Sequence, residues 1–450
     1  MTGAHVLIAG GGIAGIAAAL DLARAGVRVT LVETRKKLGG RATSFVDART
    51  GETLDNCQHV AMGCCPAYLS LCKDLGVDHL LTWTRAQHWH EAGGRVSVLK
   101  PGLLPAPAHF AEAFTLARFL TLREKIAIAR GMLALRGATP LRGLLAPGRT
   151  FSEVLRDLRQ PEGAVRKFWL PVIVSACNLH PDRADANLAA KVFREGFLRS
   201  ARDTEIGVSS VPLVRLYDAA FDLIQARGGT VILGASVERL TPTSLALSRA
   251  EGDALLTADA VVCALPCERV PGVVDPAFHD ERFAAIAQTE FSPILGVHLF
   301  FDRPVLSTPH AVLVDRPTQW IFRKDDQGAR LHAVISAADD WMPLTEDQIA
   351  SRVLDDLAAC VPASRGAKLV SVRAVKEKRA TFAATPAFQA SRPATVRADG
   401  GGVILAGDYI VPTGDPDLIP WPATMEGATR SGQAAAREAL RRLHAPPPAR

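Results

Sequence analysis

The stretch of sequence that decides the fold is HVLIAGGGIAGIAAALDLARAGVRVTLVE, residues 5–33. A short apolar run enters a cluster of glycines, an Ala/Leu-rich segment follows as far as Gly26, and a second apolar run ends at Glu33. This order predicts a strand, a tight turn, a helix and a second strand. A βαβ unit of about 30 residues places its two strands side by side in a parallel sheet. The sequence therefore predicts an α/β fold.

The glycines of this stretch have the GxGxxG spacing between strand and helix. Such glycines allow a tight turn, close approach of the backbone to a pyrophosphate, and close packing of the helix. Glu33, at the end of the second strand, is placed to accept hydrogen bonds from ribose hydroxyls and favours an unphosphorylated ribose. The residues expected to hold the dinucleotide here are Gly10, Gly12, Ile13, Ala14, Gly15 and Glu33.

A second glycine pair, Gly39 and Gly40, precedes Arg41 and makes a loop that delivers a guanidinium toward the same phosphates. A dehydrogenase that uses NAD does not need this element. The order of GxGxxG, Glu33 and GGR resembles the N-terminal signature of the FAD-binding flavoproteins that include amine oxidases and phytoene-type desaturases. The resemblance implies FAD as the cofactor, a Rossmann-like FAD-binding domain, and contacts from Gly40 and Arg41.

Near the C-terminus, LAGDY (405–409) and WPATMEGATRSGQAAA (421–436) are similar to the second flavin signature of that superfamily. The resemblance implies that Asp408 binds the ribityl chain and that Val237, in GASVERL, touches the adenine. A helix that begins near Met425 would aim its positive end at the flavin edge that becomes anionic on reduction. The further residues implied to bind FAD are Gly407, Thr424, Met425 and Glu426.

The middle of the chain resembles one branch, the squalene-associated hydroxysqualene dehydroxylases of hopanoid synthesis. The segments that carry this resemblance are LDNCQHVAMGC (54–64), FWLPVIVSACNLHPDRADA (168–186) and EKRATFAATP (377–386). It implies an FAD-dependent oxidoreductase that reduces hydroxysqualene, a lipophilic C30 isoprenoid, to squalene. Cys57 stands where the family pattern has glycine, and GDPDLIP (414–420) looks like an insertion, so these two places leave the substrate open.

Three further functions stay open beside this one. A carotenoid desaturase would use FAD to oxidise a polyene, the opposite redox direction. The sequence pattern hardly distinguishes the oxidative from the reductive enzyme. A flavin amine oxidase is disfavoured because Tyr68, Tyr217 and Tyr409 are the only tyrosines available for a tyrosine cage. A prenyl-binding escort protein would have little need of both Glu33 and Asp408.

Removal of an allylic hydroxyl requires a proton for the departing water, a hydride from reduced flavin, and a dry pocket. Asp55 and His59 are the candidate proton donors, because their segment runs close to the flavin in the family. The alternative is that Asp55 caps a turn and that His59 is a satisfied structural group. The reaction also needs an electron donor for FAD, which the sequence does not identify.

The eight cysteines lack the paired CxxC spacing of a zinc site, so no metal is expected. They are predicted to be buried free thiols, as suits a reducing cytosol.

The net charge of the chain is 52 − 46 = +6, and residues 101–150 hold seven basic against two acidic residues. Because a C30 isoprenoid is practically insoluble, the enzyme must collect it from a bilayer. The basic segment therefore predicts reversible, peripheral contact with the inner face of the cytoplasmic membrane, with a solvated helix surface as the alternative. No segment reads as a membrane span or a signal peptide, and no nucleic-acid-binding module is recognisable.

A length of 450 residues suits two or three domains. The sequence predicts a discontinuous FAD domain interleaved with an α+β substrate domain that bears a helical cap. Residues 101–150 and 211–226 are predicted to be helical, and residues 291–301 and 331–337 to be strands of a separate sheet. The expected segments are 1–90, 206–285 and 391–444 for the FAD domain, 91–205 for the cap, 286–390 for the substrate sheet, and 445–450 as a flexible tail.

Overall fold

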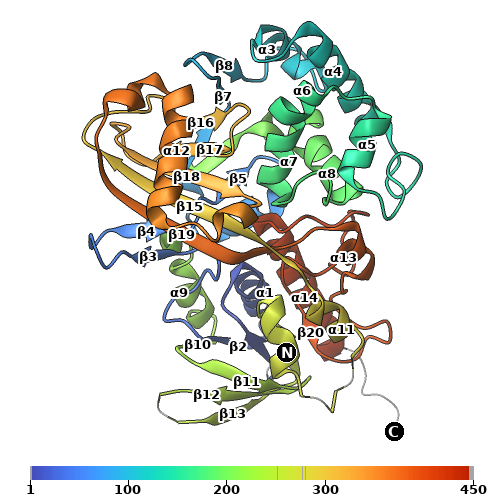
Figure 1. Cartoon of the computed structure of the whole chain (residues 1–450). Coiled ribbons are helices and arrows are strands. Elements are labelled where there is room, and N and C mark those ends of the chain that lie inside the picture. The colour runs from blue at the N-terminus through green and yellow to red at the C-terminus, as the bar shows by residue number, and fades with distance from the viewer. Residues whose placement is uncertain (1–2, 251, 276, 279, 445–450) are drawn as a thin grey trace.

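The computed structural model describes residues 3–250, 252–275, 277, 278 and 280–444 of the chain. The predicted flexible tail, 445–450, lies outside the described residues. Figure 1 shows a parallel sheet with its helices in the lower half of the view, a long sheet at the upper left and a group of helices at the upper right. The predicted α/β class is confirmed.

The lower sheet has five parallel strands in the order β10-β2-β1-β14-β20. The bounds of these strands are β1 His5–Ala9, β2 Arg28–Glu33, β10 Thr230–Leu233, β14 Ala260–Cys263 and β20 Ile404–Leu405. The central strands β1 and β14 are apolar on both faces, as expected of strands that helices cover on either side. Three distant parts of the chain therefore meet in one sheet.

Helices α1 (Ile13–Arg24) and α14 (Met425–His444) pack against each other beside this sheet. Their backbones approach so closely that a Cβ on Gly432 would lie 2.1 Å from the carbonyl oxygen of Ala14. Only glycine fits at that crossing. The remaining helices next to the sheet are α2 (Pro66–Asp74) and α9 (Ala219–Gln225), and shorter helices further along are α10 (Val270–Val273), α11 (Arg282–Ala287) and α13 (Pro386–Ser391).

The helix predicted over residues 211–226 is wrong in its first half, because α9 begins only at Ala219. Residues Leu213–Leu216 form a 3₁₀ turn instead. The N–H of Leu213 donates to Asp55 and the N–H of Val214 donates to Ser44, so both groups are engaged across the fold.

Small sheets surround the main one. Strands β11 (Ser236–Leu240), β12 (Ser244–Ser248) and β13 (Ala254–Thr257) form an antiparallel meander at the bottom of Figure 1. The remaining short strands are β3 (Ser44–Val46) with β4 (Thr53–Asp55), and β5 (Val60–Met62) and β6 (Leu81–Thr84) on either side of β9 (Ile206–Ser209).

The upper sheet has seven strands in the order β19-β15-β18-β17-β16-β7-β8. Its strands are antiparallel except where β16 meets β7. The bounds are β7 Gln87–His90, β8 Val96–Leu99, β15 Phe291–Phe301, β16 His310–Leu313, β17 Trp320–Arg323, β18 Arg330–Ser336 and β19 Leu369–Phe382. Helix α12 (Glu346–Cys360) packs on this sheet around a core of its own.

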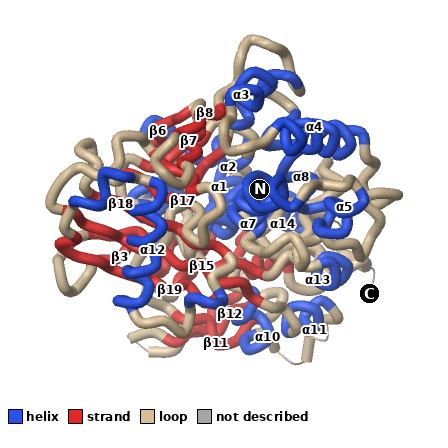
Figure 2. Tube along the Cα trace, turned by 45° about the horizontal axis from the view of Figure 1, so that its top comes forward, coloured by secondary structure: helices blue, strands red, loops and turns tan. Residues whose placement is uncertain are grey.

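A helical cap lies beside the upper sheet, and Figure 2 shows its helices grouped on one side of the molecule and the strands on the other. Its helices are α3 Ala111–Leu116, α4 Leu122–Gly137, α5 Phe151–Asp157, α6 Glu162–Ala164, α7 Leu170–Cys177 and α8 Ala186–Phe193. The helix expected over 101–150 is thus two shorter helices that start at Ala111, after the prolines of residues 101–107. Within the described residues, no helix combines the length and apolar character needed to cross a membrane.

Candidate active site

The glycine turn after β1 forms a cradle at the start of α1. Gly10 has a φ of +106°, and a Cβ on Gly15 would lie 1.9 Å from the carbonyl oxygen of Gly10. Within the described residues, α1 has neither a side-chain cap nor an acid in its first turn. The N–H groups of Ile13 and Ala14 therefore meet no competing carboxylate, and the geometry fits the pyrophosphate of a dinucleotide.

Glu33 is fixed at the edge of this cradle. Its Oε2 accepts a hydrogen bond of 2.7 Å from the N–H of Gly11, and its Oε1 accepts one of 2.8 Å from the N–H of Arg35. A carboxylate has lone pairs beyond these two bonds, so Glu33 can still accept from ribose hydroxyls. The ribose-binding role expected from the sequence stays a prediction.

Val237 lies near the same edge. It is a buried residue of β11 and pairs with Leu247 of β12. The N–H of Ala235 donates to the carbonyl oxygen of Glu33 over 3.1 Å, which brings the start of β11 beside the end of β2. An adenine bound next to Glu33 would therefore find Val237 within the neighbouring wall.

Arg41 and Asp408 meet on the other side of the cradle. Gly40 approaches the glycine turn so closely that its Cβ would lie 3.0 Å from the Cα of Gly12. Nη2 of Arg41 then lies 2.5 Å from Oδ1 of Asp408, and Nη1 donates to the carbonyl oxygen of Ala380. Two residues that the sequence assigns separately to FAD are thus in direct contact.

The start of α14 completes this side. The N–H of Gly407 donates to Oγ of Ser431 over 3.0 Å, and Oγ1 of Thr424 accepts from the N–H of Gly427 over 3.1 Å. Thr424 thereby caps the first turn of α14. Met425 follows as the first residue of the helix, and its sulfur lies 3.9 Å from the hydroxyl of Tyr217.

The side chain of Glu426 forms a hydrogen bond with the neighbouring helix α2. Its Oε2 accepts a 2.8 Å hydrogen bond from the N–H of Tyr68 at the start of α2, and its Oε1 pairs with Nε of Arg430 at 2.6 Å. Glu426 is fully buried by these contacts. Any contact of this residue with a cofactor therefore falls to its main chain.

Asp55 lies at the end of β4 and is buried. Its Oδ1 accepts from Oγ of Ser44 (2.7 Å) and from the N–H of Leu213 (2.9 Å), and its Oδ2 pairs with Nζ of Lys324 at 3.1 Å. The same ammonium also donates to Oε1 of Gln58. The oxygens of Asp55 therefore act as acceptors, which favours the structural alternative that the sequence left open for this residue.

His59 is half-buried and donates from Nδ1 to the carbonyl oxygen of Cys57 over 3.3 Å. Burial lowers the pKa of His59 below its ordinary value of 6.5, against the opposing effect of this hydrogen bond. The imidazole is neutral near pH 7 with its proton on Nδ1, so Nε2 can give a proton to a substrate only after the ring has taken up a second one.

Two histidines that sequence reasoning missed lie behind this segment. His298 of β15 and His332 of β18 are register partners whose rings stack at 3.9 Å, and we call them the histidine pair. Nε2 of His298 donates to the carbonyl oxygen of Asp55 over 2.8 Å. Burial, helped by the charges of His298 and Lys324, holds the pKa of His332 well below 6.5.

His332 is fully buried, and both of its ring nitrogens are without a hydrogen-bond partner in the described structure. A Cβ on Gly296 would lie 2.8 Å from Nε2 of His332 and 3.1 Å from the carbonyl oxygen of Asn56. Nδ2 of Asn56 donates in turn to the carbonyl oxygen of Arg41. Gly296 and Asn56 therefore lie between the unpartnered imidazole and the main chain of Arg41.

A small apolar cluster, separate from the three larger cores, lies at the same place. Its buried members are Cys57, Phe322 and Val334, and half-buried Val60, Val208, Ile294 and Trp320 pack on it. Burial, and secondarily the charge of Glu377, raises the pKa of the Cys57 thiol to about 12. Cys57 is therefore a neutral thiol that packs as an apolar member of this cluster.

The 414–420 segment is tied to two helices. Oδ2 of Asp417 accepts from Nζ of Lys191 in α8 (2.8 Å) and from the indole N–H of Trp421 (3.1 Å), and Arg430 of α14 pairs with it at 3.2 Å. The cations of Lys191 and Arg430 also lie 4.8 and 5.5 Å from the ring centre of Trp421. The segment thus joins the cap to α14.

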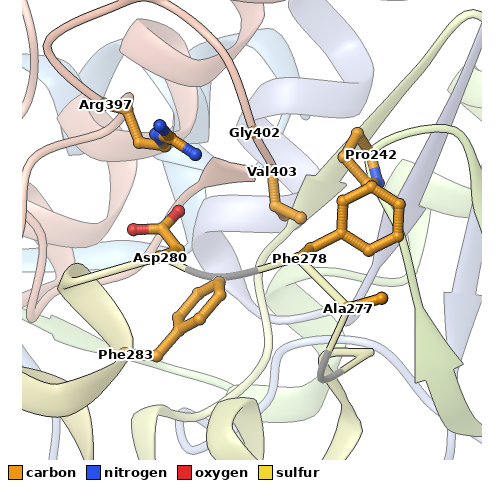
Figure 3. Close-up of a pocket in the computed structure, with 8 residues that line it drawn as sticks. All are labelled: Pro242, Ala277, Phe278, Asp280, Phe283, Arg397, Gly402 and Val403. Carbon is orange, nitrogen blue, oxygen red and sulfur yellow. The ribbon is translucent and has the colours of Figure 1, made fainter.

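A hollow of about 380 Å³ lies elsewhere (Figure 3). It is lined by Pro242, Ala277, Phe278, Asp280, Phe283, Arg397, Gly402 and Val403. These residues include none of the cradle and none of the histidine pair. Within the described residues, no group of three or more His, Cys, Asp or Glu side chains is placed to hold a metal ion. All eight cysteines are free thiols, and all are buried as predicted except Cys65, which is half-buried.

A model of the flavin containing amine oxidoreductase family matches residues 13–440. The chain belongs to this family. FAD fits the geometry, since Glu33 and Gly40 both lie against the glycine turn and Arg41 contacts Asp408. The resemblance and the cofactor inferred from the sequence are confirmed, and the protein is an FAD-dependent oxidoreductase.

The sequence relatives of this flavoenzyme span almost its whole length. It is 28% identical to a hydroxysqualene dehydroxylase of Sinorhizobium fredii, over 97% of this chain and 98% of the relative. It is 29% identical to a hydroxysqualene dehydroxylase of Rhodopseudomonas palustris, over 96% and 97%. It is 25% identical to a 15-cis-phytoene desaturase of Synechococcus elongatus, over 97% and 96%.

Solved structures share the fold at low identity. An oxidoreductase from Methanosarcina mazei superposes with a TM-score of 0.71 at 16% identity, covering 96% of this chain and 100% of that one. A putrescine oxidase superposes with a TM-score of 0.67 at 19% identity, covering 97% and 99%. These similarities confirm the fold, a Rossmann-like domain combined with a second α+β domain.

Proposed function

We propose that this flavoenzyme reduces a hydroxylated C30 isoprenoid, hydroxysqualene, to its hydrocarbon. The observation that carries the proposal is the buried, unpartnered His332 beside the apolar cluster of Cys57, Phe322 and Val334. A hydrocarbon chain suits the cluster, and one hydroxyl on that chain would find a hydrogen-bonding imidazole. Relatives named hydroxysqualene dehydroxylase that align over nearly the full chain add support.

The chemistry divides between cofactor and chain. The allylic C–O bond breaks, the departing oxygen takes a proton and leaves as water, and the carbon takes a hydride. Reduced FAD supplies that hydride when bound. The chain binds the hydrocarbon, excludes water from the reacting carbon, and holds a proton at an imidazole nitrogen.

Asp55 and His59 remain the proposed proton-donor candidates. The contacts favour His59, because Asp55 already accepts hydrogen bonds from Ser44, Leu213 and Lys324. We assign to the Asp55 and Lys324 pair the task of fixing residues 55–59 against the upper sheet. His332 joins His59 as a proton-handling group, and the donor that reduces FAD is a further, unidentified partner.

A carotenoid desaturase is the second candidate, and the full-length relative named 15-cis-phytoene desaturase favours it. The same apolar cluster would suit a polyene. A polyene, however, offers no polar group to the unpartnered nitrogens of His332, so the dehydroxylase accounts for more of the site.

An amine oxidase and an escort protein both lose support from the geometry. Tyr68 and Tyr217 are buried and join their hydroxyls at 3.1 Å, and the hydroxyl of Tyr409 donates to Leu265, so a tyrosine cage for an amine has no donor residues in the described structure. An escort protein would have no use for a complete dinucleotide cradle.

We propose the same domain division as the sequence predicts. Residues 1–90, 206–285 and 391–444 form the FAD unit, and residues 91–205 and 286–390 form the cap and the substrate sheet. Strands β7 and β8 do not follow this division, since β7 lies in the first FAD segment and β8 in the cap segment, yet both belong to the upper sheet. We also propose that the enzyme works at the cytoplasmic face of the membrane, which supplies its substrate.

An anaerobic single-turnover assay tests the proposed reaction. Dithionite-reduced holoenzyme is mixed with hydroxysqualene, and flavin absorbance is followed together with the lipid products. Flavin reoxidation that matches squalene formation is the expected result. A flavin that stays reduced would overturn the dehydroxylase, and oxidised enzyme with phytoene would then test the desaturase.

A further inference from the structure

Six large apolar side chains between residues 103 and 133 project into solvent. Their exposed fractions are 105% for Leu103, 54% for Leu104, 67% for Leu116, 74% for Leu122, 52% for Ile126 and 59% for Leu133. Single exposed apolar residues are normal on a protein surface, but a cluster of this size needs a partner. We call these six residues the apolar edge.

Helix α4 explains half of this surface. Leu122, Ile126 and Leu133 recur at helical spacing and share one face, with exposed Ala129 between the last two. The opposite face is already used, because Ile128, Met132 and Leu135 are buried in the core of the cap. The helix is therefore apolar on two faces, and the fold accounts for one of them.

The rest of the apolar edge is held next to α4. Nζ of Lys125, in the first turns of α4, donates to the carbonyl oxygen of Thr115 over 2.6 Å, which ties α4 to the end of α3 and to Leu116. The loop that carries Leu103 and Leu104 is fixed by the N–H of Gly102, which donates to the carbonyl oxygen of His109 over 2.7 Å. Figure 1 shows α3 and α4 together at the top of the molecule, beside β8.

Positive charge surrounds the apolar edge. The exposed cations are Lys100, Arg118, Arg123, Arg130 and Arg136. Of the two acids in this region, Glu112 is exposed, while Glu124 is buried and pairs with Lys167 at 3.1 Å. Leucines that reach into solvent among arginines match a bilayer of anionic lipid, which accepts the leucines below its headgroups and the arginines at them.

We propose that the apolar edge inserts into the surface of an anionic bilayer and that the flanking cations hold it there. The attachment is monotopic, through loop 103–104 and one face of α4. The proposal that this surface binds lipid depends only on the exposed apolar and basic residues. Its task, to let the enzyme take an isoprenoid from the bilayer, rests on the proposed function.

Vesicle sedimentation with the FAD-loaded enzyme tests the surface without any substrate. We expect the enzyme to sediment with vesicles of phosphatidylcholine and phosphatidylglycerol, and to do so less as sodium chloride is raised. A triple variant, Leu116→Gln, Ile126→Gln and Leu133→Gln, should bind at least about 30-fold more weakly, because three apolar side chains lose their burial in lipid. The pair Arg123→Gln and Arg130→Gln should bind about 25-fold more weakly, at about fivefold per charge.

A matched control replaces three equally exposed apolar residues elsewhere, Leu255→Gln, Val370→Gln and Leu418→Gln, whose exposed fractions are 69%, 65% and 67%. This control should bind vesicles as the parent enzyme does. Equal binding by the parent and the α3/α4 triple variant, or no binding by the parent, would overturn the proposal. A parent dimer that becomes monomeric in the triple variant without lipid would also overturn it, since the edge would then join two copies of the chain.

Turnover separates this proposal from the proposed function. The α3/α4 triple variant should reduce hydroxysqualene dispersed in detergent at the parent rate, and hydroxysqualene held in vesicles at least about tenfold more slowly. A parent enzyme that binds vesicles but reduces neither form of hydroxysqualene would leave the surface standing and overturn the reaction.

Discussion

Nη2 of Arg41 lies 2.5 Å from Oδ1 of Asp408, and 367 positions in the chain separate the two residues. The Arg41 side chain is 41% exposed and that of Asp408 only 8%. The contact therefore joins the N-terminal and C-terminal segments from which the FAD site is predicted, and its carboxylate is the more buried partner.

Removing either partner should loosen the FAD site. Asp408→Asn should lower the melting temperature less than Arg41→Gln, because the arginine variant leaves a buried carboxylate without its cation. A double-mutant cycle on thermal unfolding of the FAD-free protein should give a coupling of about 1–3 kcal/mol, since the exposure of Arg41 weakens the pair by solvent screening. Additive effects of the two substitutions would contradict the coupling.

Glu33→Ala should lower FAD retention. The substitution removes the acceptor for the ribose and frees the N–H of Gly11, so we expect binding weaker by about tenfold or more. The measurement is the ratio of flavin to protein absorbance after desalting. Glu238→Ala, an exposed carboxylate of β11, is the matched control and should keep its flavin. Unchanged flavin content in the Glu33 variant would place the adenosine elsewhere.

His332→Leu should separate catalysis from stability. Because the ring nitrogens are buried and unpartnered in the described structure, an apolar side chain should leave the melting temperature unchanged or raise it. Single-turnover reduction should nevertheless slow by about 10²–10⁴, the usual contribution of proton transfer. His109→Leu is the control, since His109 is equally buried and unpartnered but lies in the cap. Equal rates in both variants would remove His332 from the reaction.

Asp55→Asn and His59→Gln should differ in what they change. With FAD still bound, His59→Gln should slow the flavin reoxidation step and shift its pH profile. Asp55→Asn should weaken the contact with Lys324 and reduce stability first, with a smaller effect on rate. A rate loss confined to Asp55→Asn would reverse this assignment and make Asp55 the proton donor.

Acid should destabilise the fold before its carboxylates titrate. Burial lowers the pKa of His310 from 6.5 to about 3 and that of His90 to about 4. Below about pH 6.5 the unfolded chain binds protons that the folded chain does not, so stability falls as pH falls, by about 2 kcal/mol per histidine at about pH 5. His310→Phe should flatten the decline of the melting temperature between neutral pH and pH 5, whereas exposed His180→Gln should leave it unchanged.

The FAD cofactor could be predicted from the sequence because the motifs that indicate it are short and local. Gly10, Gly12 and Gly15 lie at the same turn between strand and helix, and Glu33 follows them after only one helix and one strand. The strand predicted over 291–301 is also confirmed, since an apolar run of that length reads as a strand without any partner.

The residues that we propose for the substrate side could not be predicted from the sequence, because their arrangement depends on register between distant strands. His298 and His332 look like single polar residues inside two apolar runs, and only the pairing of β15 with β18 stacks them. Nothing in the sequence around Lys324 predicts its contact with Asp55. That contact requires the end of β17 to approach a residue 269 positions earlier in the chain. A histidine inside an otherwise apolar strand is the one mark that could have drawn attention.

The five-stranded sheet sets an order on biosynthesis. Strand β20 and helix α14 leave the ribosome after every other part of the sheet, and at about 5–20 residues per second Asp408 follows Arg41 by about 20–70 s. During that interval the glycine turn, Glu33 and Arg41 have been synthesised, but Asp408 and helix α14 have not. We therefore expect the nascent chain to bind FAD fully only at the end of translation. A shortage of the vitamin from which FAD is made would then reduce FAD binding by completed chains and not by growing ones.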